Sequence, residues 1–382
     1  MYRRQLLAHC SLFAAALLTT TTTLHAAPER DIAFDTIRRM AMGGAATTIT
    51  YDDSAVMINP AGLARVKGPT IKAPRIGVDI GTDFWDASSK LSELKSANED
   101  NVEIIDSLIG TKGSVRFRLA PLAAITNKGF GLGAFGGTDF HLQINQEGSL
   151  DMAGYGDAVG AVGIARDFTF FGTRVDLGVA VKALTRISIY DKISGRQEVH
   201  LSESDLTTRI NDGTLTDAFS QFGSSGIGMD IGFLTDITLF DTPATIGGAV
   251  RNIGTTLTGQ QDVGTGNLTH TNTVTTTVPV VSTLGLSITP KLPFVGDLLM
   301  AIDYQFAPAD DTYNSIRMGV EKKLFFDTVH LRGGINQGYI VGGLGVDLRI
   351  LHFDFAYYSR ELGSKPGDIP DPMYTAQLGF FF

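Results

Sequence analysis

Charged side chains that alternate with aliphatic ones are the groups in this sequence that could do chemistry. Lys182 and Arg186 lie in one such segment, where two cations on one strand face could bind the carboxylate of an amphipathic ligand. The alternative is a set of ion pairs that holds the fold together, and both interpretations stay open. The cations of this pattern are Arg116, Arg118, Lys182, Arg186, Arg317, Arg332 and Arg349, and the carboxylates are Asp176, Asp230, Asp303, Glu321, Asp347 and Asp354.

The other reactive residue types form no recognisable catalytic or metal-binding arrangement. None of the seven histidines stands in the HxxxH or HExxH spacing that places two imidazoles on one zinc ion. The pair Asp310 and Asp311 has no further acidic neighbour, whereas calcium takes about six to eight oxygen ligands. The Gly-x-Ser-x-Gly elbow of hydrolases is absent from the sequence. We therefore predict no catalytic residues, no metal and no cofactor, and a chain that is not an enzyme.

The composition limits the class of protein. Of the 382 residues, 19% are charged, against about 25% in an average soluble domain, and 44 are glycine. No apolar run reaches the roughly 20 residues that a membrane-spanning helix needs. Helical membrane proteins are therefore excluded, but a β-barrel is not, because its strands signal weakly one by one. The net charge of −9, with no basic cluster, argues against a nucleic-acid partner.

Residues 1–26 have the form of a cleavable secretory signal peptide. Arg3 and Arg4 provide the positive start, and residues 6–18 are mostly apolar but too short to span a membrane. Ala26 ends a plausible cleavage site. The single cysteine, Cys10, lies in this segment, so we expect neither disulfides nor thiol chemistry in the mature chain.

Alternation with a period of two recurs from about residue 70 to the end. Ile227, Met229 and Ile231, for example, alternate with Gly228 and Asp230. On a barrel wall the aliphatic side chains would face lipid and the charged ones the lumen. We predict an all-β fold, a transmembrane antiparallel β-barrel of about 14 strands that occupies residues 69–382. The strands are expected at 70–82, 114–126, 129–144, 150–167, 173–190, 225–239, 242–256, 278–290, 297–308, 313–323, 327–337, 338–350, 351–361 and 372–382.

The lengths of the connections agree with this topology. Every second connection is a short turn, as on the periplasmic side of an outer-membrane barrel. The connections 83–113, 191–224 and 257–277 are long, and all three fall on the outer side. The short turns are expected at 127–129, 168–172, 240–242, 289–295, 324–326 and 350–351.

Two of the long outer connections contain apolar residues at helical spacing, which predicts helices near 86–110 and 203–222. These helices would either cap the barrel mouth by packing on themselves or offer an apolar surface to a ligand. Phe219 and Phe222 are the candidate ligand contacts of the second one. The third connection, 257–277, is rich in Thr, Gly and Asn and is predicted to be mobile.

The last nine residues form a strand with an aromatic face. Tyr374, Ala376, Leu378, Phe380 and Phe382 alternate with polar or small residues, apart from the additional aromatic at 381. An edge strand of a soluble β-protein would be one explanation. The ending also resembles the C-terminal signal strand of bacterial outer-membrane β-barrels, which implies the barrel-assembly machinery as a partner during biogenesis, with Tyr374, Leu378, Phe380 and Phe382 as the signal.

Residues 41–66 precede the first strand and carry a second resemblance. The segment contains a Met-Gly-Gly-Ala opening, an Asp-Asp-Ser-Ala step and an Asn-Pro-Ala-Gly-Leu turn. It resembles the N-terminal signature of FadL-type outer-membrane transporters and of the related PorV-type barrels. The resemblance implies that residues 27–68 form a plug, or hatch, inside the barrel. The matching positions are Met42, Gly43, Gly44, Asp52, Asp53, Asn59, Pro60 and Ala61.

The resemblance leaves two functions open. FadL-like behaviour implies passive uptake of hydrophobic or amphipathic small molecules, fatty-acid-like or hydrocarbon. The stretches 331–336, 342–347 and 353–357 look more like PorV-type barrels, which implies a docking or shuttle component for secreted proteins. An apolar lumen would favour transport, and a polar, filled lumen would favour docking. In both cases we expect a bacterial outer-membrane location, contact with outer-membrane lipid and a monomer, because a closed barrel has no free edge.

Overall fold

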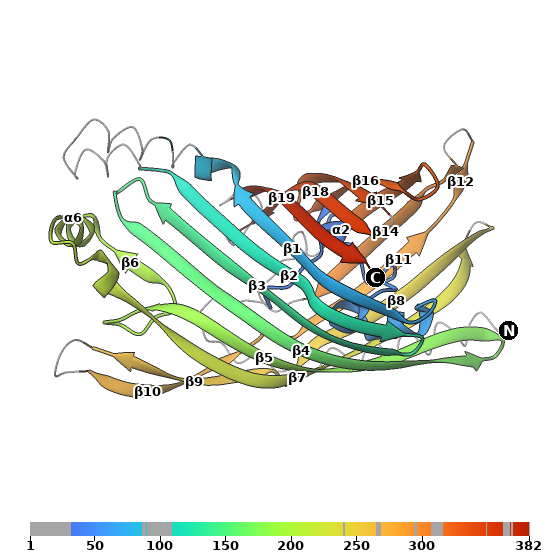
Figure 1. Cartoon of the computed structure of the whole chain (residues 1–382), viewed down its shortest axis with the longest axis horizontal. Coiled ribbons are helices and arrows are strands. Elements are labelled where there is room, and N and C mark those ends of the chain that lie inside the picture. Colours follow the sequence, from blue (N-terminus) through green and yellow to red (C-terminus); the bar gives the residue numbers. More distant parts are fainter. Residues whose placement is uncertain are drawn as a thin grey trace.

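The computed structural model describes most of the chain after residue 31. The described residues are 32–85, 89, 109–239, 241–264, 269–293, 296–306, 316–348, 350–361, 367 and 370–381. The strands wrap into a closed wall because β1 (Thr70–Gly81) pairs with both β2 (Lys112–Asn127) and β19 (Pro370–Phe381), all antiparallel. Figure 1 shows this wall from the side, with α6 at one end.

Within the described residues the closed wall has 14 strands. The strands between β2 and β19 are, in order around the wall, β3 (Phe130–Ile144), β4 (Leu150–Phe170), β5 (Thr173–Asp191), β7 (Phe219–Leu239), β8 (Thr242–Ile253), β11 (Val281–Ile288), β14 (Leu299–Phe306), β15 (Ile316–Leu324), β16 (Val329–Asn336), β17 (Tyr339–Asp347) and β18 (Leu351–Glu361). Each overlaps one predicted strand, so the prediction of an all-β antiparallel barrel is confirmed.

The outer face of the wall is apolar, and the charged side chains of the strands face inward. On β5, Leu177, Val179 and Val181 are exposed on the outside, whereas Asp176 and Lys182 are buried on the inside. Tyr374, Leu378 and Phe380 of β19 also point outward. This is the alternation that a barrel in lipid requires. No helix among the described residues is both long enough and apolar enough to cross a bilayer.

The wall is much taller on one side than on the other. β4 and β7 have 21 residues each, whereas β14 and β16 have 8. The long strands extend past the rest of the barrel at the end that carries α6 (Figure 1). This end also carries the long connections, and the opposite end, which we call the short-turn end, carries the short ones.

The second long connection is helical only in part. α6 (Glu203–Asn211) and the 3₁₀ helix η2 (Leu215–Ala218) lie in it, together with the short strand β6 (Val199–Leu201). Phe219 and Phe222, predicted to be helical, are instead the first residues of β7, because β5 continues to pair with β7 up to Asp191 and Phe219. The other predicted helical region, 86–110, lies almost wholly outside the described residues.

The third long connection is a hairpin rather than a loop. β9 (Thr256–Val263) and β10 (His270–Thr277) pair along their full length. Threonine favours strands, and here it supplies strand propensity without the apolar alternation by which the other strands were recognised. The remaining small hairpin, β12 (Lys291–Leu292) with β13 (Gly296–Asp297), lies in a turn at the short-turn end.

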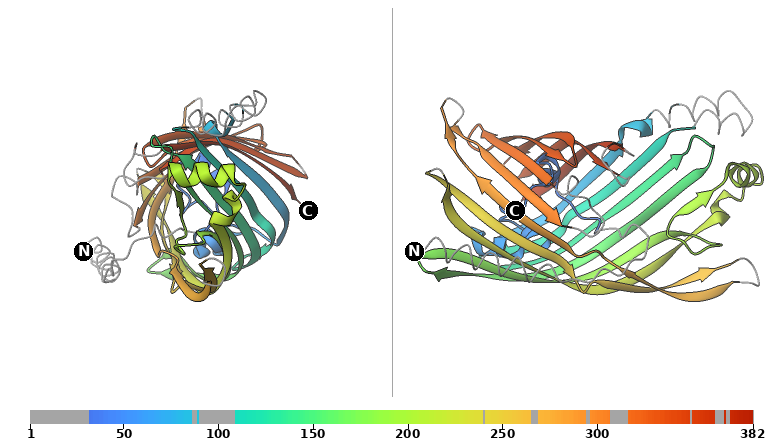
Figure 2. Two further views of the ribbon diagram at one scale, coloured as in Figure 1. Left: turned by 90° about the vertical axis from the view of Figure 1, so that its left-hand side faces the viewer. Right: turned by 180° about the vertical axis from the view of Figure 1, so that it is seen from behind.

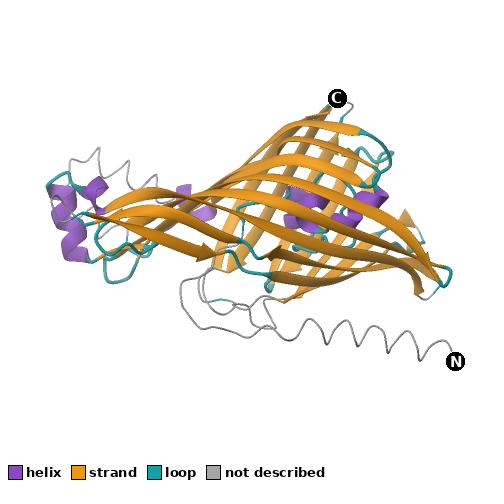
Figure 3. Cartoon of the chain, turned by 90° about the horizontal axis from the view of Figure 1, so that it is seen from below, coloured by secondary structure: helices purple, strands orange, loops and turns teal. Residues whose placement is uncertain are grey.

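Residues 32–66, here called the inner segment, lie inside the barrel (Figures 2 and 3). They form α2 (Ile37–Ala41), α3 (Ala55–Ile58) and the 3₁₀ helix η1 (Pro60–Arg65). α2 packs against β16 to β18, and η1 packs against β4, β5 and β7. Most apolar side chains of the segment are buried, and they form its core together with inward-facing residues of the wall.

Candidate functional site

The interior of the barrel, where the inner segment meets the wall, holds most residues of the predicted motif. Gly43 and Gly44 have φ of +64° and +84°, a region that favours glycine. The backbone of Met42 and Gly43 lies so close to β15 and β16 that a Cβ on Gly319 would be 2.3 Å from the Met42 carbonyl oxygen. The glycines of the motif therefore allow backbone-to-backbone packing between the inner segment and the wall.

Asn59, Pro60 and Ala61 make a close contact with the opposite side of the wall. The fully buried Asn59 side chain donates from Nδ2 to the Thr47 carbonyl at 2.9 Å, and its Oδ1 accepts from the Ala61 N–H at 3.1 Å. A Cβ on Gly178 of β5 would lie 2.3 Å from the Pro60 carbonyl carbon. We call residues 59–61 and their partners on β5 and β7 the neutral contact, because its groups carry no charge.

The adjacent carboxylates Asp52 and Asp53 have different surroundings. Asp53 pairs with Arg75 of β1, and its other oxygen has no hydrogen-bond partner among the described residues. Burial raises the pKa of Asp53. Burial alone would also raise the pKa of Asp52, but the charge of Arg75 and the hydrogen bonds from Ser54 outweigh burial and lower it. Asp52 is therefore the carboxylate that is stabilised in its ionised form.

Lys182 and Arg186 are both buried and paired with carboxylates of the protein. The Lys182 ammonium lies 2.8 Å from Asp230, and Arg186 makes a bidentate pair with Asp157 at 2.7 and 2.8 Å. Asp157 also accepts from the N–H of Ala33 in the inner segment at 2.7 Å. Both positive charges are thus compensated in this state, and a role for them in binding a ligand's carboxylate stays a prediction.

The same kind of pairing covers the neighbouring inner wall. Arg118 contacts Asp79, and Arg360 joins Asp139 to Asp371, with 2.8 Å between Arg360 Nε and Asp371. Among the charges predicted to face the lumen, Arg349 lies outside the described residues. The lumen at the level of the inner segment is therefore largely filled, by ion pairs on this part of the wall and by an apolar cluster that includes Phe135 and Leu184 on another part.

Phe219 and Phe222 lie at the outer end of the barrel. Phe219 packs against the apolar cluster beneath α6, whose buried members include Leu206 and Ala218. Phe222 is buried, with its ring 5.7 Å from that of Tyr190 in an edge-to-face arrangement. Both aromatic side chains are thus occupied in packing within the outer cap.

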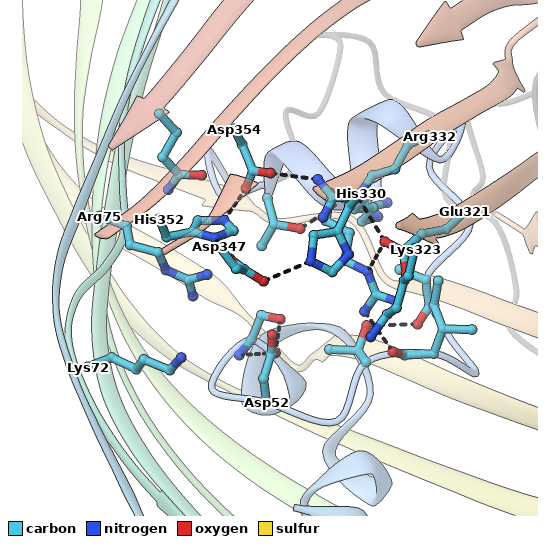
Figure 4. A pocket seen from close by; sticks show the side chains of 18 residues that line it. Asp52, Lys72, Arg75, Glu321, Lys323, His330, Arg332, Asp347, His352 and Asp354 are labelled. Atoms are coloured by element: carbon cyan, nitrogen blue, oxygen red, sulfur yellow. Dashed lines mark hydrogen bonds and ion pairs between the residues drawn. The ribbon is translucent and has the colours of Figure 1, made fainter. Parts of the chain in front are cut away.

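At the short-turn end a cavity of about 240 Å³ separates part of the inner segment from β1 and β15 to β19. Figure 4 shows that its labelled lining residues are all ionisable. The cations among them include Lys72, Arg75, Lys323 and Arg332, and the carboxylates include Asp52 and Asp347. A cavity with this lining suits water and charged groups rather than a hydrocarbon.

A chain of charged contacts runs along this cavity and ends on the inner segment. Arg38 of α2 makes a bidentate pair with Glu321 of β15, at 2.9 Å for both hydrogen bonds. Arg332 of β16 donates to Glu321 at 2.8 Å and to Asp354 of β18 at 2.6 Å. We call Arg38, Glu321, Arg332 and Asp354 the charged contact.

Two histidines extend the chain of contacts. His352 touches both Asp354 and Asp347, and His330 Nε2 lies 2.8 Å from Asp347 (Figure 4). Sequence reasoning did not single out Arg38, His330 or His352. The only feature of the sequence that could have placed the two histidines in this site is their inward-facing position on their strands. Among the described residues no group of three or more His, Cys, Asp or Glu side chains is arranged to hold a metal ion.

Comparison with known proteins gives matches only among solved structures, since no family model and no curated protein matches the chain. The toluene transporter TbuX of Ralstonia pickettii is 14% identical with a TM-score of 0.44, over 92% of this chain and 98% of that one. The toluene transporter TodX of Pseudomonas putida is 11% identical with a TM-score of 0.43, over 92% and 99%. The CymD monoaromatic hydrocarbon channel is 11% identical with a TM-score of 0.43, over 93% and 98%.

Proposed function

We propose that this chain is an outer-membrane barrel for passive uptake of hydrophobic or amphipathic small molecules, fatty-acid-like or hydrocarbon. The observation that carries the proposal is the inner segment, which fills the lumen with the same residues, 42–44 and 59–61, that resemble the FadL-type signature. A filled lumen excludes bulk diffusion of solutes, so a cargo has to move the segment or pass beside it.

The path begins at the outer end. A ligand would first contact the apolar cap that contains Leu206 and Phe219, and then enter the barrel. It would leave at the short-turn end after the inner segment separates from the wall. The charged contact is the part that opens, because it borders a cavity and Arg38 is 32% exposed, whereas Asn59 and Ala61 are fully buried.

The proposal includes a location and partners. Residues 1–26 would direct export and be removed, and residues 27–68 would act as a plug. The barrel-assembly machinery would recognise Tyr374, Leu378, Phe380 and Phe382, and the assembled barrel would work as a monomer. The closed strand pairing supports a monomer, since it leaves no wall edge that needs a partner.

A second candidate function is a PorV-like docking or shuttle component for secreted proteins. The specific observation that favours it is the ion pairing of the lumen cations Lys182, Arg186 and Arg118. An apolar cargo gains nothing from such a lining. Docking would use the outer surface and leave the inner segment in place.

Uptake by the purified barrel in lipid vesicles separates the two candidates. We expect saturable uptake of a long-chain fatty acid or of toluene, and faster uptake by Glu321→Gln, which weakens the hold on Arg38. The matched control is Asp371→Asn, which removes a carboxylate from an arginine pair that does not involve the inner segment. Absence of uptake in all three proteins, together with a secreted protein that co-purifies in fixed stoichiometry, would favour docking.

A further inference from the structure

The cavity at the short-turn end is lined by several side chains that the charged contact does not use. It measures about 240 Å³, and six Lys or Arg side chains and four carboxylates line it. Lys72 and Arg75 come from β1, Lys323 from β15 and His330 from β16. Figure 4 shows Lys72 and Arg75 on one side of the cavity and Lys323 and His330 on the other. A group bound in the cavity would therefore meet basic side chains from three strands.

The carboxylates of the lining already have partners in the protein. Asp52 accepts hydrogen bonds from Ser54, Asp347 contacts both histidines, and the other two carboxylates belong to the charged contact. Lys323, by contrast, lies 3.7 Å from its ion-pair partner Asp327, which is too long for a hydrogen bond. The cavity therefore suits an anion better than a cation.

Two buried nitrogens of the lining residues have no hydrogen-bond partner among the described residues. Arg75 is 8% exposed and contacts Asp53 through Nη2, but its Nε–H has no acceptor. His330 is 5% exposed, with Nε2 at 2.8 Å from Asp347 and Nδ1 without a partner. An ionised carboxylate only accepts hydrogen bonds, so Nε2 carries the proton and Nδ1 of the neutral ring is an acceptor. The protein thus leaves one donor and one acceptor unsatisfied here.

This combination selects the chemistry of a ligand. Basic side chains on opposite sides favour a compact anion whose oxygens point in several directions. The unsatisfied acceptor favours an anion that also carries an O–H group, because an unpaired buried polar atom is costly. Hydrogen phosphate meets both conditions. Sulfate has the same shape but no proton at neutral pH, and an ionised carboxylate accepts hydrogen bonds without donating any.

We propose that this cavity is a binding site for inorganic phosphate, whose oxygens accept from Lys72, Arg75 and Lys323 and whose O–H donates to His330. Thr36 and Ser54 of the inner segment also line the cavity, so the bound anion touches the segment and the wall together. Phosphate thereby adds a link beside the charged contact and holds the inner segment in place. It acts as a regulator rather than as cargo, and the site is independent of whether the barrel transports or docks.

Calorimetric titration of the purified barrel in detergent, in a phosphate-free buffer at neutral pH, tests the site. The ligands are inorganic phosphate, sulfate and dihexanoyl phosphatidic acid, whose headgroup is a phosphate monoester. Lys323→Gln removes a charge from the cavity. The matched control is Lys322→Gln, because Lys322 does not line the cavity and donates to the Asp297 carbonyl at 3.0 Å. His330→Phe removes the acceptor.

We expect saturable binding of phosphate and weaker binding of sulfate. Phosphate should bind roughly fivefold more weakly to Lys323→Gln, as for the loss of one partly exposed ion pair. In His330→Phe the preference for phosphate over sulfate should disappear. Phosphate should also slow amide hydrogen exchange of residues 36–50 in the parent protein.

Three results would overturn the proposal. Sulfate that binds the parent as tightly as phosphate would show that no acceptor in the site is used. An equal loss of phosphate affinity in Lys322→Gln would show that the anion binds elsewhere. Binding of phosphatidic acid without binding of inorganic phosphate would assign the cavity to a lipid headgroup. None of these results depends on uptake, so this test and the test of transport fail separately.

Discussion

The inner segment is held to the barrel by two contacts that differ in kind. The charged contact joins Arg38 to Glu321 through hydrogen bonds beside a cavity. The neutral contact places Pro60 and Ala61 directly against the backbone of β5 at Gly178, with no space for an added Cβ. One contact depends on charge and water, and the other depends on shape.

This difference indicates which side of the segment can move. The charged contact borders a cavity lined by ionisable side chains, so other charged partners lie close to Arg38 when it separates from the buried Glu321. Close packing between backbones has no comparable substitute, since separation leaves a void or a buried group without a partner. The neutral contact is therefore the fixed side of the segment, and the charged contact is the side that opens.

The largest effect is expected from Glu321→Gln. This change leaves Arg38 and Arg332 facing each other across a neutral amide, and loss of one partner of a buried pair costs about 3 kcal/mol. Amide hydrogen exchange of residues 36–50 should become much faster, while exchange of the wall strands stays the same. Equal protection in Glu321→Gln and in the control Asp371→Asn would show that the charged contact does not hold the segment.

A smaller effect is expected from Gly178→Ala, which adds bulk at the neutral contact instead of removing a charge. The added Cβ would lie 2.3 Å from the backbone of Pro60 and Ala61, and overpacking of this kind costs roughly 1–3 kcal/mol. Gly160→Ala is the matched control, because a Cβ there meets nothing within 4 Å. The midpoint of urea unfolding should fall for Gly178→Ala only. An unchanged midpoint would mean that the neutral contact tolerates movement.

The wall was predictable because its signal is local. Alternation such as Ile227, Met229 and Ile231 against Gly228 and Asp230 fixes both the strand and its orientation within a few residues. The β9–β10 hairpin was missed for the same reason, since its threonines and glutamines carry no apolar alternation. Phe219 and Phe222 were assigned to a helix because apolar spacing over a short stretch fits helix and strand alike.

The two contacts of the inner segment could be predicted only in part. Asn59 and the paired glycines stood out as residue types with special backbone roles, and the structure places them against the wall. Arg38 and Glu321 are 283 residues apart, and no local pattern links them. Which inward-facing charges pair depends on strand order around the barrel, which alternation alone does not give.

Asn59→Ala tests the neutral contact by removing hydrogen bonds rather than by adding bulk. The change leaves the buried Thr47 carbonyl and the Ala61 N–H without their partner and should cost about 1–2 kcal/mol of unfolding free energy. Because Asn59 does not titrate, the cost should be the same at pH 7 and at pH 3. Thermal unfolding of the variant and the parent at both pH values measures it.

The smallest effect, and the sharpest contrast with Asn59, is expected from Asp52→Asn beside the cavity. The folded barrel lowers the pKa of Asp52 below its ordinary value of 3.8. Burial alone would raise this pKa, but the charge of Arg75 and other favourable contacts outweigh burial. A carboxyl with a lowered pKa stabilises the fold above its ordinary pKa and loses this contribution as the pH falls through the lowered value. Asp52→Asn should therefore lower the melting temperature at pH 7 and have no such effect in acid. Asn59→Ala should lower the melting temperature by the same amount at both pH values. A pH-independent cost for both variants would show that the charge of Asp52, which lies beside the charged contact, adds no stability to the fold.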